Sequence, residues 1–179
     1  MFRFIFSCFF FFLTGSFFIS CAPVYSQLGG DFKGPPEALQ RKLTPTAKNL
    51  IAKAYADIDP SRLVDFHTHI LGLGNSNSGV WVNPAMQTRI NPMRYFRFQV
   101  FKNASGISKN DSADQDYVAR LLRLIENLPK PGRFMILGFD KHYRPDSKED
   151  LERTEFLEPN DYIFSLVNKT PKIFLPMIS

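Results

Sequence analysis

The amino-acid sequence predicts an α/β fold in which strands alternate with helices. Residues 62–70, 134–139 and 173–178 have the composition and the boundaries of buried strands. Residues 114–128 lie between the first and second of these strands, and residues 160–169 lie between the second and third. Both segments carry apolar side chains at helical spacing. This order is typical of parallel sheets, which either close into a barrel or stay open as a doubly wound sheet.

The first 20 residues are predicted to be an export signal and are left out of the fold. Arg3 precedes an uncharged apolar run over residues 4–19, as in a signal peptide. Cys21 ends a sequence similar to a bacterial lipoprotein box, so it is the candidate lipidated residue. Cleavage after Ser26 and an uncleaved membrane anchor are the alternatives. We therefore expect an exported protein: a cell-envelope lipoprotein, or a periplasmic or secreted protein that reaches the membrane through its signal or lipid.

Residues 21–43 are rich in Gly, Pro and polar residues, which predicts a tether or N-terminal extension. Thr44 and Pro45 then supply an N-cap and a first helical residue. Apolar residues follow at helical spacing until Pro60. The folded domain is therefore expected to cover residues 44–179.

The remaining segments of the domain follow in order. Gly, Asn and Ser dominate residues 71–92, and loops of this length are usually functional or disordered. Residues 91–103 are compatible with a helix. Residues 114–128 give the clearest helix, with apolar residues at i, i+3, i+4 and i+7. Residues 134–139 form a continuous apolar run, as in a strand buried on both faces, and a polar loop over residues 140–158 comes next.

Composition removes several classes of function. The formal net charge is +5, but the charges are scattered and form no basic block, so nucleic-acid binding has no support. Cys8 lies inside the predicted signal, so a cleaved chain keeps at most Cys21 and has no intrachain disulfide. The sequence also lacks a Gly-x-Ser-x-Gly elbow and a phosphate-binding glycine loop.

His67 and His69 are the candidate metal ligands. Residues i and i+2 of a strand point to the same face, so two imidazoles near a strand end can converge on one divalent ion such as zinc, iron or manganese. Asp65 shares that face and is expected to orient one of the histidines. Two unrelated histidines at a strand end are the alternative. The Gly-rich loop that follows favours a site, because barrel enzymes build theirs at this end of the strands.

Residues 63–70, LVDFHTHI, resemble the first barrel strand of the metal-dependent amidohydrolase superfamily, which begins with an apolar-Asp-x-His-x-His pattern. Residues 160–176 are similar in rhythm to its amidohydrolase-related branch. The resemblance implies a (β/α)8 TIM barrel, of which this chain would encode about the first three units. It also implies that His67 and His69 bind one or two divalent metal ions, with zinc the expected one.

The implied activity is hydrolysis of amide, ester or lactone bonds in a small molecule by a metal-activated water. A metal-dependent decarboxylase of the same family is one alternative, and a non-catalytic exported α/β lipoprotein is another. The family's other ligands and its general base come from later strands. We therefore assign no catalytic residue and expect this chain to be an N-terminal fragment that is inactive by itself.

Asp140 and His142 follow the second predicted strand and so belong to the same end of the sheet as the two histidines. They are candidates for contact with the substrate or for positions around the metal. The alternative is a solvated loop, in which both side chains face water.

Overall fold

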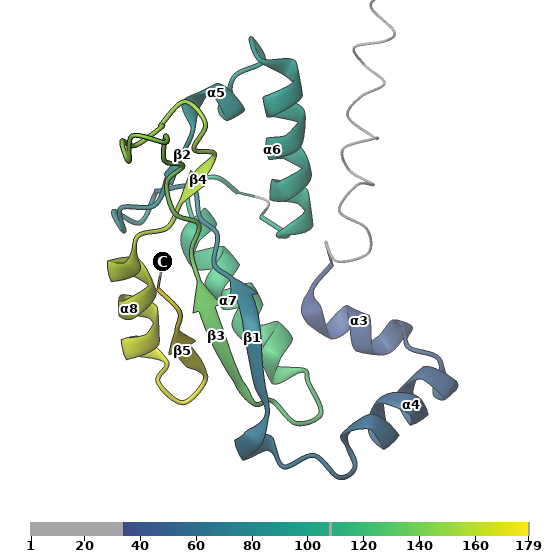
Figure 1. The fold of residues 1–179 in the computed structure, drawn as a ribbon. Helices are drawn as coiled ribbons and strands as arrows, with labels where there is room; N and C mark the ends of the chain where they lie inside the picture. Colours follow the sequence, from purple (N-terminus) through teal and green to yellow (C-terminus); the bar gives the residue numbers. More distant parts are fainter. Residues whose placement is uncertain (1–33, 108, 179) are drawn as a thin grey trace, which may run out of the picture.

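The computed structural model describes residues 34–107 and 109–178 (Figure 1). The predicted export signal, Cys21 and most of the predicted tether lie outside these residues. Among the helices of the described ranges, none has both the length and the apolar character needed to cross a lipid bilayer.

The α/β class predicted from the sequence is confirmed. Three parallel strands, β1 (Val64–His69), β3 (Arg133–Leu137) and β5 (Phe174–Pro176), form one sheet in the order β1-β3-β5. Each corresponds to one of the three strands expected from apolar runs. Over the described residues this sheet stays open and does not close into a barrel.

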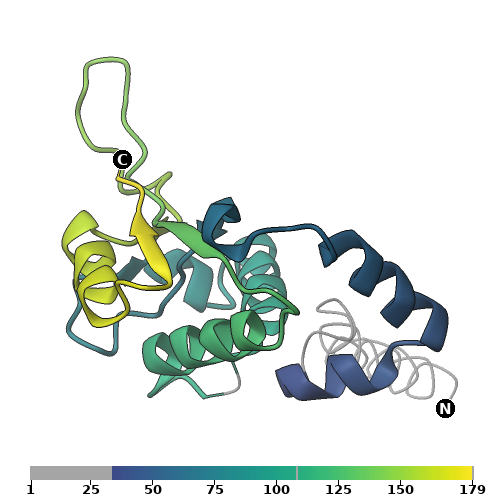
Figure 2. The same cartoon turned by 90° about the horizontal axis from the view of Figure 1, so that it is seen from below.

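Two helices connect these strands and cover one face of the sheet. Helix α7 (Ala113–Glu126) lies between β1 and β3, and α8 (Asn160–Lys169) lies between β3 and β5, which matches the two predicted helices. Figure 2 shows both helices on the same side of the strands. Their apolar stripes pack against the sheet because burial removes these side chains from water. The buried core comprises Ile70, Val80, Ile125, Phe134, Ile136, Tyr162, Ile163, Leu166 and Phe174.

A second, smaller layer lies beyond the carboxyl ends of β1 and β3 (Figure 1). It contains a two-stranded antiparallel ribbon, β2 (Trp81–Val82) with β4 (Phe156–Leu157), and the helices α5 (Pro84–Gln87) and α6 (Pro92–Ala104). The ribbon joins the loop after β1 to the loop after β3, so both loops belong to one layer. Its core comprises Val82, Met86 and Phe98.

Part of the segment interpreted from sequence as a tether is helical. Residues Pro36–Lys42 form helix α3, which contacts α7. The Arg123 guanidinium donates two hydrogen bonds to the Glu37 carboxylate, at 2.9 and 2.5 Å. A local reading of Gly, Pro and polar residues could not reveal this helix, because the partner of Glu37 lies 86 residues further along the chain.

The helix expected after Thr44 is present as α4 (Pro45–Tyr55). The Thr44 hydroxyl accepts a hydrogen bond from the Ala47 N–H at 3.1 Å, which caps the first turn. No residue of α4 is buried, so it contributes little to the core. A short 3-10 helix, η2 (Pro60–Arg62), then leads into β1.

Candidate functional site

His67 and His69 converge at the carboxyl end of β1. Their Nε2 atoms are 2.9 Å apart, and the two rings meet edge to face with centroids 4.7 Å apart. Two imidazole nitrogens bound at about 2.0–2.1 Å to one zinc ion would be separated by about 2.9 Å at a right angle and by about 3.3 Å at a tetrahedral angle. At this distance the two Nε2 atoms form a hydrogen bond, and a small opening of the pair would give the separation of two tetrahedral ligands of a single ion.

The strand that carries the pair is irregular. The register of β1 against β3 shifts between Asp65 and Thr68, so simple alternation of faces does not hold through the whole motif. The Asp65 carboxylate accepts a hydrogen bond from the backbone N–H of His67 at 2.9 Å. Asp65 was expected to orient an imidazole; this contact instead fixes the backbone from which the His67 side chain extends.

His69 is held more firmly than His67. Its ring stacks on Phe139, with centroids 4.4 Å apart and planes 4° from parallel, and its carbonyl accepts a hydrogen bond from the Tyr117 hydroxyl at 2.8 Å. Burial lowers the pKa of His69, and the nearby charge of His67 lowers it further. A lowered pKa favours the neutral imidazole, which is the form that binds a metal ion.

The donors around this pair do not make a complete metal site. In the part of the chain that the structure describes, no group of three or more His, Cys, Asp and Glu side chains could hold an ion. Catalytic zinc sites usually have three protein ligands and one water. The pair therefore fits two of the ligands, and any others would have to come from water or from groups beyond the described residues. The Nδ1 atom of His69 is buried and has no hydrogen-bond partner among the described residues.

Asp140 and His142 lie at the same end of the sheet as the histidine pair but line a separate cavity, of about 470 Å³. The Asp140 carboxylate accepts the N–H of Lys141 at 2.7 Å. The backbone N–H of His142 donates to the Thr154 hydroxyl at 2.9 Å, which ties the start of this loop to its end. Both residues thus follow β3, and the lining of their cavity includes neither His67 nor His69.

Sequence reasoning missed the buried carboxylate of Asp114, the second residue of α7. Its two oxygens accept hydrogen bonds from the backbone N–H groups of Leu73 (2.6 Å), Gly74 (3.1 Å) and Ser76 (3.2 Å). They also accept from the Ser76 hydroxyl at 2.5 Å. Asp114 therefore fixes the loop that leaves β1 directly after the histidine motif. An Asp at a helix start is common, and only the fold reveals which loop it holds.

Glu158 is a second buried carboxyl group that the sequence did not single out. One of its oxygens accepts the Phe139 N–H at 2.8 Å, and the other is buried without a hydrogen-bond partner among the described residues. Burial raises the pKa of Glu158 to about 8, and the nearby Asp114 contributes in the same direction. Glu158 therefore keeps its proton up to about neutral pH, and it bonds the backbone of Phe139, the residue on whose ring His69 stacks.

Comparisons with protein-family models, curated proteins and solved structures found no match to the chain. The resemblance of residues 63–70 to the amidohydrolase superfamily thus rests on their sequence pattern. Function has to be argued from the geometry of the site itself.

Proposed function

We propose that this chain provides the first metal-binding strand of a hydrolase of the amidohydrolase type, acting on amide, ester or lactone bonds. The observation that carries the proposal is the 2.9 Å separation of the His67 and His69 Nε2 atoms at the carboxyl end of a parallel strand. In α/β enzymes this end of the sheet is where active sites are built.

The arrangement of the sheet supports the same reading. Parallel strands in the order β1-β3-β5, joined by α7 and α8, are what the first three units of a (β/α)8 barrel would give. His69 pairs in register with Leu137, the neighbour of the buried Ile136, so its side chain lies on the face opposite the helices. In a barrel that face would be the interior, where the metal ion belongs.

The residues at and around the histidine pair have distinct roles in this proposal. A bound divalent ion would polarise the substrate carbonyl and lower the pKa of its water. His67 and His69 would hold the ion through Nε2. Phe139 and Tyr117 keep the His69 ring and backbone in place, and Asp65 does the same for the His67 backbone. We assign the general base to no described residue.

Zinc binding by the full-length chain tests the proposal. Equilibrium dialysis against zinc, followed by elemental analysis, should give about one ion per chain, held weakly because only two protein ligands are described. The double variant His67→Ala/His69→Ala should lose this ion, whereas His142→Ala should keep it. Equal zinc content in the double variant and the unmodified chain would rule the site out.

Turnover gives a second reading in the same samples. We expect little zinc-dependent hydrolysis of 4-nitrophenyl acetate, because two imidazoles leave most coordination positions to water. A rate well above that of free zinc, lost in the double variant, would instead show that further groups complete the site.

A further inference from the structure

The cavity of about 470 Å³ beside the histidine pair has mostly apolar walls. Leu71 follows β1, Phe101 comes from α6, Phe139 follows β3, and Phe156 belongs to β4. Phe101 and Phe156 meet edge to face, with ring centroids 5.6 Å apart. The aromatic surface that these rings form suits a planar, apolar ligand packed against it, because rings prefer offset or edge-to-face contacts with other rings.

Phe139 connects this cavity to the candidate metal site. Its ring stacks on His69 at 4.4 Å and lies 6.1 Å from the ring of Phe156. A ligand that contacts Phe139 inside the cavity would therefore lie one ring away from the histidine pair. This distance allows one end of a small molecule to occupy the cavity while its other end reaches His67 and His69.

The cations that line the cavity differ in how far they are paired. Arg97 forms two contacts with the Glu155 carboxylate, at 2.7 and 2.9 Å, and Lys141 is paired with Glu149. Among the described residues Arg153 has one distant ion pair, in which its Nε lies 3.8 Å from Asp150, and 71% of its side chain is exposed. The outer nitrogens of Arg153 thus keep donors for a ligand, and a planar guanidinium suits a carboxylate.

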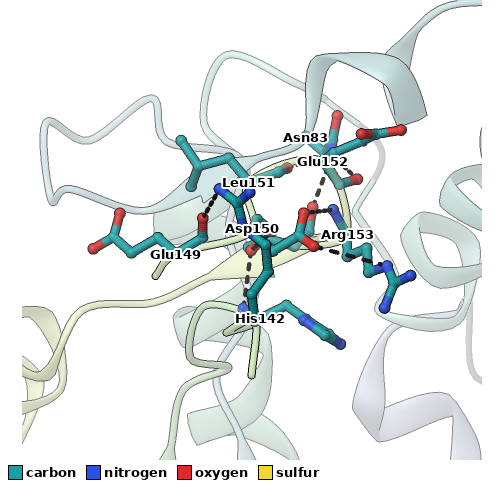
Figure 3. Close-up of polar contacts among 9 residues, drawn as sticks. Asn83, His142, Glu149, Asp150, Leu151, Glu152 and Arg153 are labelled. Atoms are coloured by element: carbon teal, nitrogen blue, oxygen red, sulfur yellow. Dashed lines mark hydrogen bonds and ion pairs between the residues drawn. The ribbon is translucent and has the colours of Figure 1, made fainter. Parts of the chain in front are cut away.

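One hydrogen-bond network within the loop holds the backbone of His142 close to that of Arg153 (Figure 3). The backbone carbonyl of His142 accepts a hydrogen bond from the Asp150 N–H at 2.7 Å. The backbone N–H of His142 donates to the Thr154 hydroxyl at 2.9 Å. That hydroxyl in turn donates to the Asp150 carbonyl at 2.8 Å. Figure 3 shows the His142 and Arg153 side chains extending to the same side of this hydrogen-bond network.

Asn83 connects this hydrogen-bond network to the rest of the fold. Its buried side-chain amide donates to the carbonyls of Leu151, Glu152 and Thr154, at 3.1, 3.2 and 2.8 Å, and its oxygen accepts the Ala85 N–H at 2.9 Å. The loop that presents Arg153 is therefore fixed before any ligand arrives. Such preorganisation reduces the entropy lost on binding.

We propose that this cavity binds the free carboxylate and aromatic ring of a small amide or ester substrate. The carboxylate lies against Arg153 and His142, and the ring packs against the surface formed by Phe101, Phe139 and Phe156. Asp140 also lines the cavity, but its negative charge acts on the neighbouring Lys141. The role of the cavity as a substrate pocket rests on the proposed hydrolase function, whereas binding of the carboxylate and the ring requires no metal ion.

Benzoate binding to the metal-free full-length chain tests the pocket. In a nuclear magnetic resonance titration, benzoate should shift the signals of the aromatic walls, and benzyl alcohol should bind more weakly. Arg153→Gln should weaken benzoate binding about tenfold, because a hydrogen bond between charged groups is lost. Arg144→Gln is the matched control, since Arg144 lies in the same loop, bonds the Glu149 carbonyl and does not line the cavity, so benzoate affinity should stay unchanged.

Several results would overturn the pocket. These are unchanged benzoate affinity in Arg153→Gln, equal weakening in Arg144→Gln, or stronger binding of benzylamine than of benzoate, which would assign the cavity to a cation at Asp140. The metal proposal is separated by the same titration. Benzoate binding retained in His67→Ala/His69→Ala supports a pocket that works without the ion, and a chain that binds benzoate but no zinc would overturn the hydrolase proposal alone.

Discussion

Two loops meet at the carboxyl end of the sheet, and they are fixed in opposite ways. The loop after β1, residues 71–80, turns its backbone N–H groups towards one buried acceptor, the Asp114 carboxylate. The loop after β3, residues 138–155, turns its carbonyls towards one buried donor, the Asn83 amide. A charged acceptor and a neutral donor thus perform the same structural task on neighbouring loops.

The difference decides which side chains remain available to a ligand. In the first loop the hydroxyls of Ser76 and Ser78 are turned to Asp114, so the polar groups near this anchor are already occupied. Among the described residues of the second loop, the Asn83 amide bonds backbone carbonyls, and the Arg153 and His142 side chains line the cavity. Under the two proposals above, the first loop would support the site and the second loop would bind the substrate.

Glu158 lies where both loops meet. Of the predicted changes, its titration should have the largest effect on the free energy of unfolding. Its pKa is about 8 in the folded chain and near the ordinary 4.5 when unfolded. Between these values the folded chain holds a proton that the unfolded chain has lost, so the free energy of unfolding should fall as pH rises through this window, and level off above it. The total loss should be on the order of 4 kcal/mol.

Urea unfolding at several pH values from 5 to 9 measures this loss. Glu158→Gln should remove most of the pH dependence and make the chain more stable than the unmodified protein above pH 8. Asp114→Asn should lower the pKa of Glu158, because the Asp114 charge helps to raise it. A stability that rises between pH 5 and pH 8 in the unmodified chain, and equally in Glu158→Gln, would contradict this assignment.

Asp114→Asn should cost about 2–4 kcal/mol of stability, because the amide nitrogen cannot accept the hydrogen bonds that fix the first loop. Asp116→Asn is the matched control on the same helix, since Asp116 is exposed and its carboxylate accepts a hydrogen bond from the Ser112 hydroxyl. Urea unfolding should show little change in the control. Equal losses in the two variants would mean that the first loop needs no buried anchor.

Asn83→Ala should cost about 1–3 kcal/mol, because it leaves the buried Thr154 carbonyl and the part-buried carbonyls of Leu151 and Glu152 without this donor. It should also weaken benzoate binding, since Arg153 is no longer held. Asp114→Asn, measured under conditions where it stays folded, should leave benzoate affinity unchanged. Paired titrations of the two variants therefore test the division between a supporting and a recognising loop, and the reverse pattern would refute it.

Local patterns predicted much of the fold. The strands and helices β1, α7, β3, α8 and β5 each carry their own apolar periodicity, so each could be located without knowing its neighbours. The proximity of His67 and His69 was also expected from their spacing of two residues, although the register of β1 shifts between Asp65 and Thr68.

The anchors could not be predicted, since their partners are distant in sequence. Asp114 bonds residues about 40 positions earlier, and Asn83 bonds carbonyls about 70 positions later. Helix α3 and the ribbon of β2 and β4 are short and depend on such contacts, so they were missed as well. Asp140 and His142 were placed at the right edge by strand order, but only the fold shows that they line the cavity with Arg153.

The most direct test is to locate zinc in crystals of the full-length chain by anomalous diffraction at the zinc absorption edge. We expect one peak within about 2.1 Å of both the His67 and the His69 Nε2 atoms. A peak at His142 or at exposed carboxylates, with the His67 and His69 Nε2 atoms still in contact and no ion between them, would contradict the proposed site.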